Sequence, residues 1–289
     1  MDLLCLLVIL GLAAALPLKS PSSHINGLNR TQFVIGGQLA EPGHFPYHIF
    51  ISYSQSDGKP YICGGSLLSP THVLTAAHCT VDMQPPARVM AGAVNINVDE
   101  SGGAQWREVQ AAHAHPHYQH GDPSYLNDIA ILEVSPPFDV GGTVALTHIP
   151  ANDEQLLAGG QVIISGFGTY TFDGHQTVPS RDLRYVQLDL YDTDYCNQQW
   201  SSFTGGRTNV GSTQVCAGGA GRGSGPGDSG GPLVVHSSHG LIQIGLVSFG
   251  PTDPNVMFNH QDEFPAVYTR VSQHCDFIHQ YSGNTASCR

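Results

Sequence analysis

The stretch GPGDSGGPL, residues 225–233, surrounds a single Asp-Ser pair with four glycines and two prolines. Because glycine has no side chain, the backbone N–H groups beside Ser229 stay open to an approaching molecule. A serine hydroxyl is a weak nucleophile at neutral pH and needs a base within hydrogen-bond reach. The stretch therefore predicts a nucleophilic serine whose base comes from another part of the chain.

Two other stretches supply matching chemistry. In LTAAHC, residues 74–79, His78 ends an apolar run, and in YLNDIAIL, residues 125–132, Asp128 stands directly before one. Imidazole can take the serine proton and return it to a leaving amine, and a carboxylate can hold the imidazole in the required tautomer. Taken singly, these residues fit a histidine beside a structural thiol and a turn aspartate. Together with Ser229 they predict acyl transfer.

The 289 residues include 11 Lys and Arg against 23 Asp and Glu, a formal net charge of -12, which argues against nucleic-acid binding.

An apolar run at residues 3–15 predicts a signal peptide, residues 1–16, although Asp2 stands where a basic residue is usual. A buried N-terminal core helix is the alternative. Residues 17–33 are polar and predict a propeptide, with a glycosylation triplet at Asn29. We therefore expect a secreted, extracellular domain over residues 34–289, with no membrane anchor.

From Tyr47 onward, short apolar or alternating runs are separated by Gly, Pro, Asn and Asp, which predicts an all-β barrel or sandwich. Only residues 194–200 and 272–281 favour a helix. Seven cysteines are present, and Cys5 lies within the expected signal peptide. The other six can pair in several ways, and the sequence alone does not choose between them.

Taken together, the chain resembles the chymotrypsin-like (trypsin-fold) serine endopeptidases. The matching segments are VIGG (34–37), LTAAHC, LNDIAIL, ISGFGT (164–169), GDSGGP, and VSFG (247–250) before FPAVYTRV (264–271), in the family's order of His, Asp and Ser. The resemblance implies two antiparallel six-stranded β-barrels packed together, with a C-terminal helix. It places the active site in the crevice between the barrels.

The resemblance also implies the residues of this site. His78 is expected to be the general base, Asp128 its orienting partner and Ser229 the nucleophile, while the amides of Gly227 and Ser229 form the oxyanion hole. Ser248 is expected near Asp128. Aligned on GDSGGP, the substrate-binding residues are Gly223 at the base of the specificity pocket, Gly250 and Ala266 on its walls, and the backbone of Ser248, Phe249 and Gly250.

With no charge at its base, this pocket is expected to accept bulky apolar or aromatic side chains, as in a chymotrypsin-like preference. Ala266 leaves an elastase-like or broad preference open. The loop of residues 251–264 is longer than is typical, and Asp262 or Glu263 reaching into the pocket is a further alternative. The implied bridges join Cys63 to Cys79 and Cys196 to Cys216, which leaves Cys275 with Cys288, a pair outside the family's usual pattern.

Members of this family are made as zymogens, inert precursors cut before the VIGG-like segment. The new amino group pairs with the Asp before the serine, which implies cleavage of the Phe33–Val34 bond and a buried pair between Val34 and Asp228. The alternative is that Asp228 is only a turn residue. Because Phe33 fits the expected pocket, the enzyme is predicted to activate itself or to be activated by a sibling.

Two patterns resemble metal sites without matching one. Four histidines lie within residues 113–120 at irregular spacing, and Ala93 stands where a calcium ligand is expected before residues 95–100. We expect no metal and no other cofactor. The expected partners are protein or peptide substrates and proteinaceous protease inhibitors, with the chain a monomer. The competing function is a catalytically silent homologue that acts as a binding protein.

Overall fold

The computed structural model describes residues 34–158, 160–238 and 240–289. The predicted signal peptide, the predicted propeptide with its Asn29 triplet, and Phe33 lie outside the described residues.

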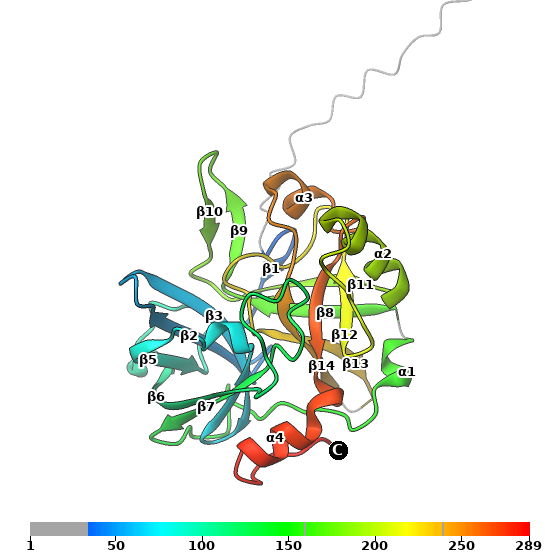
Figure 1. The fold of residues 1–289 in the computed structure, drawn as a ribbon. Helices are drawn as coiled ribbons and strands as arrows, with labels where there is room; N and C mark the ends of the chain where they lie inside the picture. Colours follow the sequence, from blue (N-terminus) through cyan, green and yellow to red (C-terminus); the bar gives the residue numbers. More distant parts are fainter. Residues whose placement is uncertain (1–33, 159, 239) are drawn as a thin grey trace, which may run out of the picture. The chain divides into compact units, whose positions relative to one another are not determined.

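Six antiparallel strands close the first barrel (Figure 1). In barrel order they are β2 (His48–Ser54), β3 (Pro60–Ser69), β4 (His72–Thr75), β7 (Ala130–Ser135), β6 (Gln105–Ala114) and β5 (Gln84–Ala91). The period of two in β2 sends Ile49 and Ile51 into the barrel core. Phe50, on the opposite face, packs on Phe167 of the second half, with ring centroids 5.3 Å apart. Both faces of this strand are therefore buried.

The second half of the chain forms the second barrel. Its strands, in barrel order, are β8 (Gln161–Gly166), β11 (Arg184–Tyr191), β12 (Gln214–Gly218), β15 (Ala266–Arg270), β14 (Gly240–Phe249) and β13 (Pro232–Ser237). Pairing of β13 with β8 closes the ring, and β1 (Gln38–Leu39) is added outside it on β11. A hairpin of β9 (Thr169–Phe172) and β10 (Thr177–Pro179) follows β8. The predicted fold of two six-stranded barrels is thus confirmed.

Both segments predicted to be helical are helices. The helix α2 (Thr193–Thr204) begins after Asp192, whose side chain accepts hydrogen bonds from two amides of the first turn. It ends at Gly205, whose φ of 65° is the left-handed conformation typical of a helix C-cap. The C-terminal helix α4 (Cys275–Tyr281) follows a 3-10 turn, Val271–His274.

Two further helices, α1 (Glu154–Leu157) and α3 (Pro254–Asn259), lie outside the prediction. With one or two turns each, they are too short to show a helical period in the sequence. None of the helices among the described residues is long and apolar enough to cross a membrane.

The two implied disulfides and the remaining pair are all present. Cys63–Cys79 fastens β3 to the turn after β4, and Cys196–Cys216 fastens α2 to β12. Cys275–Cys288 ties the start of α4 to the end of the chain. The bridges confirm both the pairing that the family resemblance implied and the remaining pair that lies outside its usual pattern.

Candidate active site

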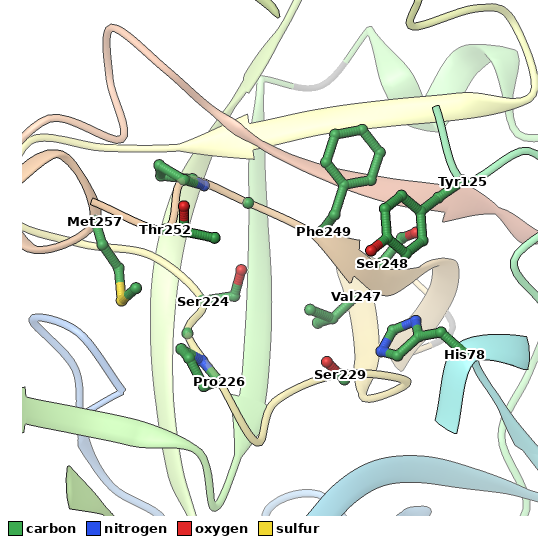
Figure 2. A pocket seen from close by; sticks show the side chains of 13 residues that line it. His78, Tyr125, Ser224, Pro226, Ser229, Val247, Ser248, Phe249, Thr252 and Met257 are labelled. Carbon is green, nitrogen blue, oxygen red and sulfur yellow. The ribbon is translucent and has the colours of Figure 1, made fainter. Parts of the chain in front are cut away.

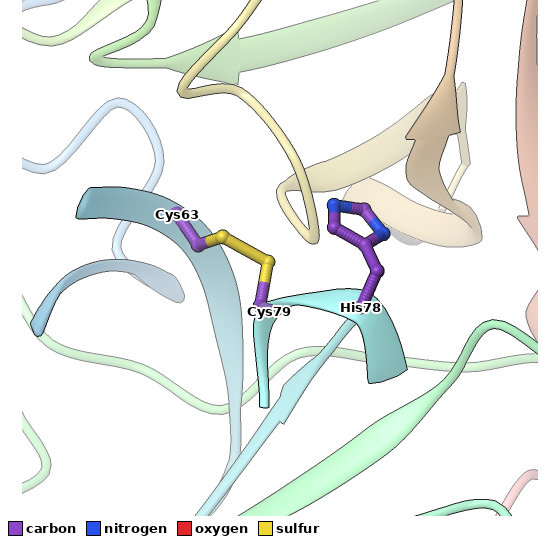
Figure 3. A group of neighbouring side chains, drawn as sticks. All are labelled: Cys63, His78 and Cys79. Carbon is purple, nitrogen blue, oxygen red and sulfur yellow. A yellow bond between two sulfur atoms is a disulfide. The ribbon is translucent and has the colours of Figure 1, made fainter. Parts of the chain in front are cut away.

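His78 lies in a short 3-10 helix, Ala77–Cys79, directly after β4. Its neighbour Cys79 is bonded to Cys63 of β3 (Figure 3). Ligand atoms of these three residues lie within 4.8 Å of one another, which is a grouping of metal-binding types. Because each sulfur is bonded to the other, neither is a thiolate, and only the imidazole of this cluster remains as a ligand. The bridge instead holds the histidine turn against the barrel wall.

Asp128 is fully buried just before β7. Its Oδ2 accepts hydrogen bonds from Nδ1 of His78 at 2.8 Å and from Oγ of Ser248 at 2.6 Å. Its Oδ1 accepts the backbone N–H of His78 at 2.9 Å. A buried carboxylate is stable only when donors hydrogen-bond to it, and Asp128 has three. Ser248 occupies the position beside Asp128 that the sequence predicted.

The carboxylate changes the acidity of the imidazole. Burial lowers the pKa of His78, but the charge of Asp128 and the hydrogen bond that His78 donates to it raise that pKa by more, so the pKa lies above its ordinary value. Since Asp128 occupies Nδ1, the other ring nitrogen, Nε2, is left for a further partner. Figure 2 shows the His78 ring beside Ser229 in one pocket.

Ser229 lies in a tight loop between β12 and β13. The backbone N–H of Gly64 donates to the carbonyl of Ser229 at 2.7 Å, and that of Gly230 donates to the carbonyl of Val247 at 2.7 Å. Gly227 has a φ of 95° and Gly230 one of 75°, conformations open to glycine but strained for other residues. A Cβ on Gly230 would lie 2.2 Å from Oγ1 of Thr75. The glycines of the GDSGGP stretch are thus required by the turn.

The same turn leaves two backbone donors open. Among the hydrogen bonds between described residues, none uses the N–H of Gly227 or that of Ser229. These are the two amides that the resemblance assigned to the oxyanion hole. Backbone donors that already stand in place can stabilise a developing negative charge without reorganisation.

Asp228 points away from this pocket into the protein. Its side chain accepts the backbone N–H of Gly168 at 2.9 Å and that of Gly225 at 3.0 Å. Burial raises the pKa of Asp228 to about 7, although both amides lower it. No Lys, Arg or His among the described residues forms an ion pair with it. The carboxyl therefore has no cationic partner among the described residues, and the resemblance leads us to expect one from the amino group of Val34.

The segment that carries Val34 is already packed inside the molecule. Val34 and Ile35 are fully buried, and Val34 belongs to the core of the second barrel. The carbonyl of Ile35 accepts the backbone N–H of Gly223 at 3.0 Å. Residues 34–35 thus contact the same stretch of chain, residues 223–225, whose shape Asp228 holds.

A pocket of about 270 Å³ opens between His78 and Ser229 at one end and Thr252 and Met257 at the other (Figure 2). Among the residues predicted to bind substrate, Ser248, Phe249 and Gly250 line it. Gly223 and Ala266 are buried and do not line it.

The lining residues that the sequence analysis missed include Thr252 and Met257. Both belong to the long loop of residues 251–264, and its unusual length was the available signal. Met257, in α3, is 4% exposed, and its Sδ would lie 3.6 Å from a Cβ on Gly225. A buried thioether thus packs against Gly225.

The acids of this loop lie elsewhere. Glu263 pairs with His260 at 3.3 Å on the surface. Asp262 lies near Tyr191. Burial raises the pKa of Tyr191, and the negative charges of Asp189 and Asp262 raise it further. Neither acid lines the pocket.

The histidines of residues 113–120 and the segment of residues 95–100, whose sequences resemble metal sites, contact other parts of the protein. His113 forms a 2.8 Å contact with Glu133 of β7, and the ring of His115 packs on Phe277 of α4 at 5.0 Å. Asn95 donates to Asp182 at 2.5 Å. These residues join neighbouring segments of the fold.

Comparison with known proteins gives the family. The trypsin family model matches residues 34–278. Chymotrypsin-C of Mus musculus is 32% identical over 254 residues, covering 86% of this chain and 89% of that protein. Fibrinolytic enzyme isozyme C of Lumbricus rubellus is 33% identical, covering 85% of this chain and 98% of that protein. Mast cell protease 3 of Ovis aries is 33% identical, with 85% and 87% covered. The chain therefore belongs to the trypsin family of chymotrypsin-like serine proteases.

Proposed function

We propose that this protein is a secreted serine endopeptidase that hydrolyses peptide bonds through an acyl-enzyme. The observation that carries the proposal is the buried carboxylate of Asp128, which binds His78 at the edge of the pocket that holds Ser229. Membership of the trypsin family implies protein substrates. Three disulfides support secretion, because such bridges persist in oxidising compartments.

The mechanism follows from the positions of these groups. His78 removes the proton from Ser229 as the serine oxygen attacks the substrate carbonyl, and Asp128 stabilises the imidazolium that forms. The amides of Gly227 and Ser229 donate to the oxyanion. His78 then gives its proton to the leaving amine, and the acyl group stays on Ser229. Water, activated by His78, releases the acyl group in the second half of the reaction.

We further propose that the chain is made as a zymogen. Cleavage of the Phe33–Val34 bond frees an amino group, which pairs with Asp228 and holds the loop of residues 225–228 in its oxyanion-binding shape. The raised pKa of Asp228 and the buried position of Val34 support this pairing. Phe33 is apolar, which supports activation by the enzyme itself or by a sibling protease with an apolar preference.

The pocket supports a preference for apolar side chains before the cleaved bond. Val247 and Met257 line it, and no charged residue other than His78 is among its lining residues. Arginine and lysine side chains find no carboxylate there. Proteinaceous protease inhibitors that present an apolar side chain would bind in the same pocket. We propose that the chain acts as a monomer.

The experiment that tests the function is covalent labelling. The chain activated at Val34 is treated with an organophosphate or sulfonyl fluoride, and the modified residue is found by peptide mass spectrometry. We expect one label on Ser229, absent from Ser229→Ala and weak on the uncleaved precursor. Failure of the activated chain to be labelled would favour a silent homologue that acts as a binding protein.

A separate experiment tests the activation. The Ser229→Ala precursor is incubated with the activated enzyme, and the new terminus is sequenced. A terminus at Val34 supports self-activation, and its absence rules it out.

A further inference from the structure

A side chain from the long loop packs against Gly223, behind the residues that line the end of the pocket. Gly223 stands at the position expected for the base, and a Cβ built on it would lie 2.0 Å from Oε1 of Gln261 and 2.1 Å from its Cδ. The amide of Gln261 therefore fills the space into which a side chain at position 223 would extend. Only glycine fits at position 223, because protein interiors are too closely packed to hold both a Cβ there and the Gln261 amide.

The glutamine is fixed in this position. It is fully buried, and its Nε2 donates to the carbonyl of Ser224 at 2.8 Å and to that of Met257 at 2.9 Å. Both acceptors belong to residues that line the pocket. Its backbone is also confined, since a Cβ on Gly218 would lie 2.0 Å from the carbonyl oxygen of Gln261. Displacing this amide would break two buried hydrogen bonds, so Gln261 is part of the pocket's framework.

The two hydrogen bonds set the direction of the amide. Both protons of Nε2 go to carbonyls, and the buried Oε1 has no partner among the described residues. The pocket itself ends at Ser224, Thr252 and Met257, short of Gly223. Gln261 thus stands between the open pocket and the position where the resemblance placed its base.

We propose that Gln261 sets the depth of the specificity pocket, so that the enzyme cleaves after apolar side chains of intermediate length, such as leucine and methionine, in preference to tyrosine, tryptophan, lysine and arginine. The inference rests on the proposed protease function. A longer side chain would have to displace Ser224 or Met257, which the buried amide of Gln261 holds in place at the end of the pocket. One extra methylene in a substrate side chain typically changes the ratio of kcat/KM between two substrates about 10-fold or more.

The test compares two peptide substrates that differ only in the residue before the cleaved bond, leucine or tyrosine. In Gln261→Ala we expect the ratio of kcat/KM for tyrosine to that for leucine to rise about 10-fold or more. Gln261→Met, which refills the space without the amide, should keep the wild-type ratio. Gln280→Ala, at an exposed glutamine of α4, is the matched control. An unchanged ratio in Gln261→Ala, or an equal rise in Gln261→Met, overturns the proposal.

Active-site titration with a serine reagent separates this result from the proposed function. Wild-type enzyme that does not titrate contradicts the protease function, whereas enzyme that titrates with an unchanged ratio contradicts only the role of Gln261. If Gln261→Ala does not fold, Gln261→Asn, shorter by one methylene, gives the same comparison with a smaller expected rise.

Discussion

Oγ of Ser248, in β14, donates a 2.6 Å hydrogen bond to Oδ2 of Asp128, which precedes β7. This contact links the second barrel to the carboxylate that orients His78 in the first. The positions of His78 and Asp128 therefore depend on how the two barrels pack, as well as on the first barrel alone.

Replacing Ser248 with alanine removes one donor from a buried carboxylate. We expect kcat/KM to fall about 10-fold, because a hydrogen bond to a charged group typically contributes about 1.5–3 kcal/mol and part of this is recovered by relaxation. The pH profile should shift with it, since Asp128 then interacts differently with His78. Thr269→Val is the control, because Oγ1 of Thr269 donates to the backbone carbonyl of Asp128 and not to its carboxylate. A loss of equal size in the control would show that the effect is structural.

Asp128→Asn should lower kcat by about 10⁴-fold, as is typical when the triad carboxylate of a serine protease becomes an amide. Activity needs neutral His78, so it rises as the pH increases through the His78 pKa. Asp128 holds this pKa above its ordinary value, and the variant's low-pH limb should therefore lie at lower pH than the wild-type limb. The measurement is kcat/KM between pH 5 and 9. A limb that stays in place would show that Asp128 does not set the acidity of His78.

Asp228 predicts a pH dependence of the precursor's stability. Its pKa is raised to about 7 in the folded chain, so the folded state binds this proton more tightly than the unfolded state. The resulting stabilisation is complete below pH 4 and is lost as the pH rises toward 7. The Asp228→Asn precursor should lose less stability than wild type between pH 4.5 and 7.5 in urea titrations. The activated chain, in which an ammonium group joins Asp228, should not show the wild-type precursor's loss.

His48 predicts the opposite slope. It is buried between the barrels, its Nδ1 lies 3.0 Å from Oγ of Ser165, and burial lowers its pKa to about 3. The unfolded state therefore binds a proton below pH 6.5 that the folded state does not. Stability should fall on acidification by about 1.4 kcal/mol per pH unit from this residue. His48→Gln should remove that share of the slope between pH 6 and 4, and an unchanged slope would contradict the assignment.

Removing the Cys275–Cys288 bridge should lower the stability of the protein without lowering its kcat. It closes a sequence separation of 13 residues, and removing such a bridge costs about 3 kcal/mol by the chain-entropy relation. In the variant with both cysteines changed to serine we expect a lower urea midpoint and an unchanged kcat at 25 °C. The bridge belongs to α4, whose residues do not line the pocket. A reduced kcat in folded protein would show that the C-terminus influences the site.

The sequence by itself predicted the strands and the candidate reacting groups. Alternation in a strand such as β2 depends on only a few consecutive residues, and the GDSGGP turn requires its glycines locally. His78, Asp128 and Ser229 were proposed in the same way, because each lies in a short stretch whose composition is unusual, and in the structure Asp128 contacts His78 while His78 and Ser229 line one pocket. The short helices α1 and α3 were not found, since one or two turns carry too little periodicity.

Only the tertiary structure decided what closes the pocket. Gln261 and Met257 belong to a loop whose sequence has no period to fix its path, and their positions depend on contacts with Gly223 and Gly225, far away in the chain. The sequence left Asp262 or Glu263 open as a side chain that enters the pocket, but in the structure it is their neighbour Gln261 that packs on Gly223, behind the end of the pocket. An uncharged amide can satisfy two backbone carbonyls there, whereas a buried carboxylate would face the same carbonyls without a donor.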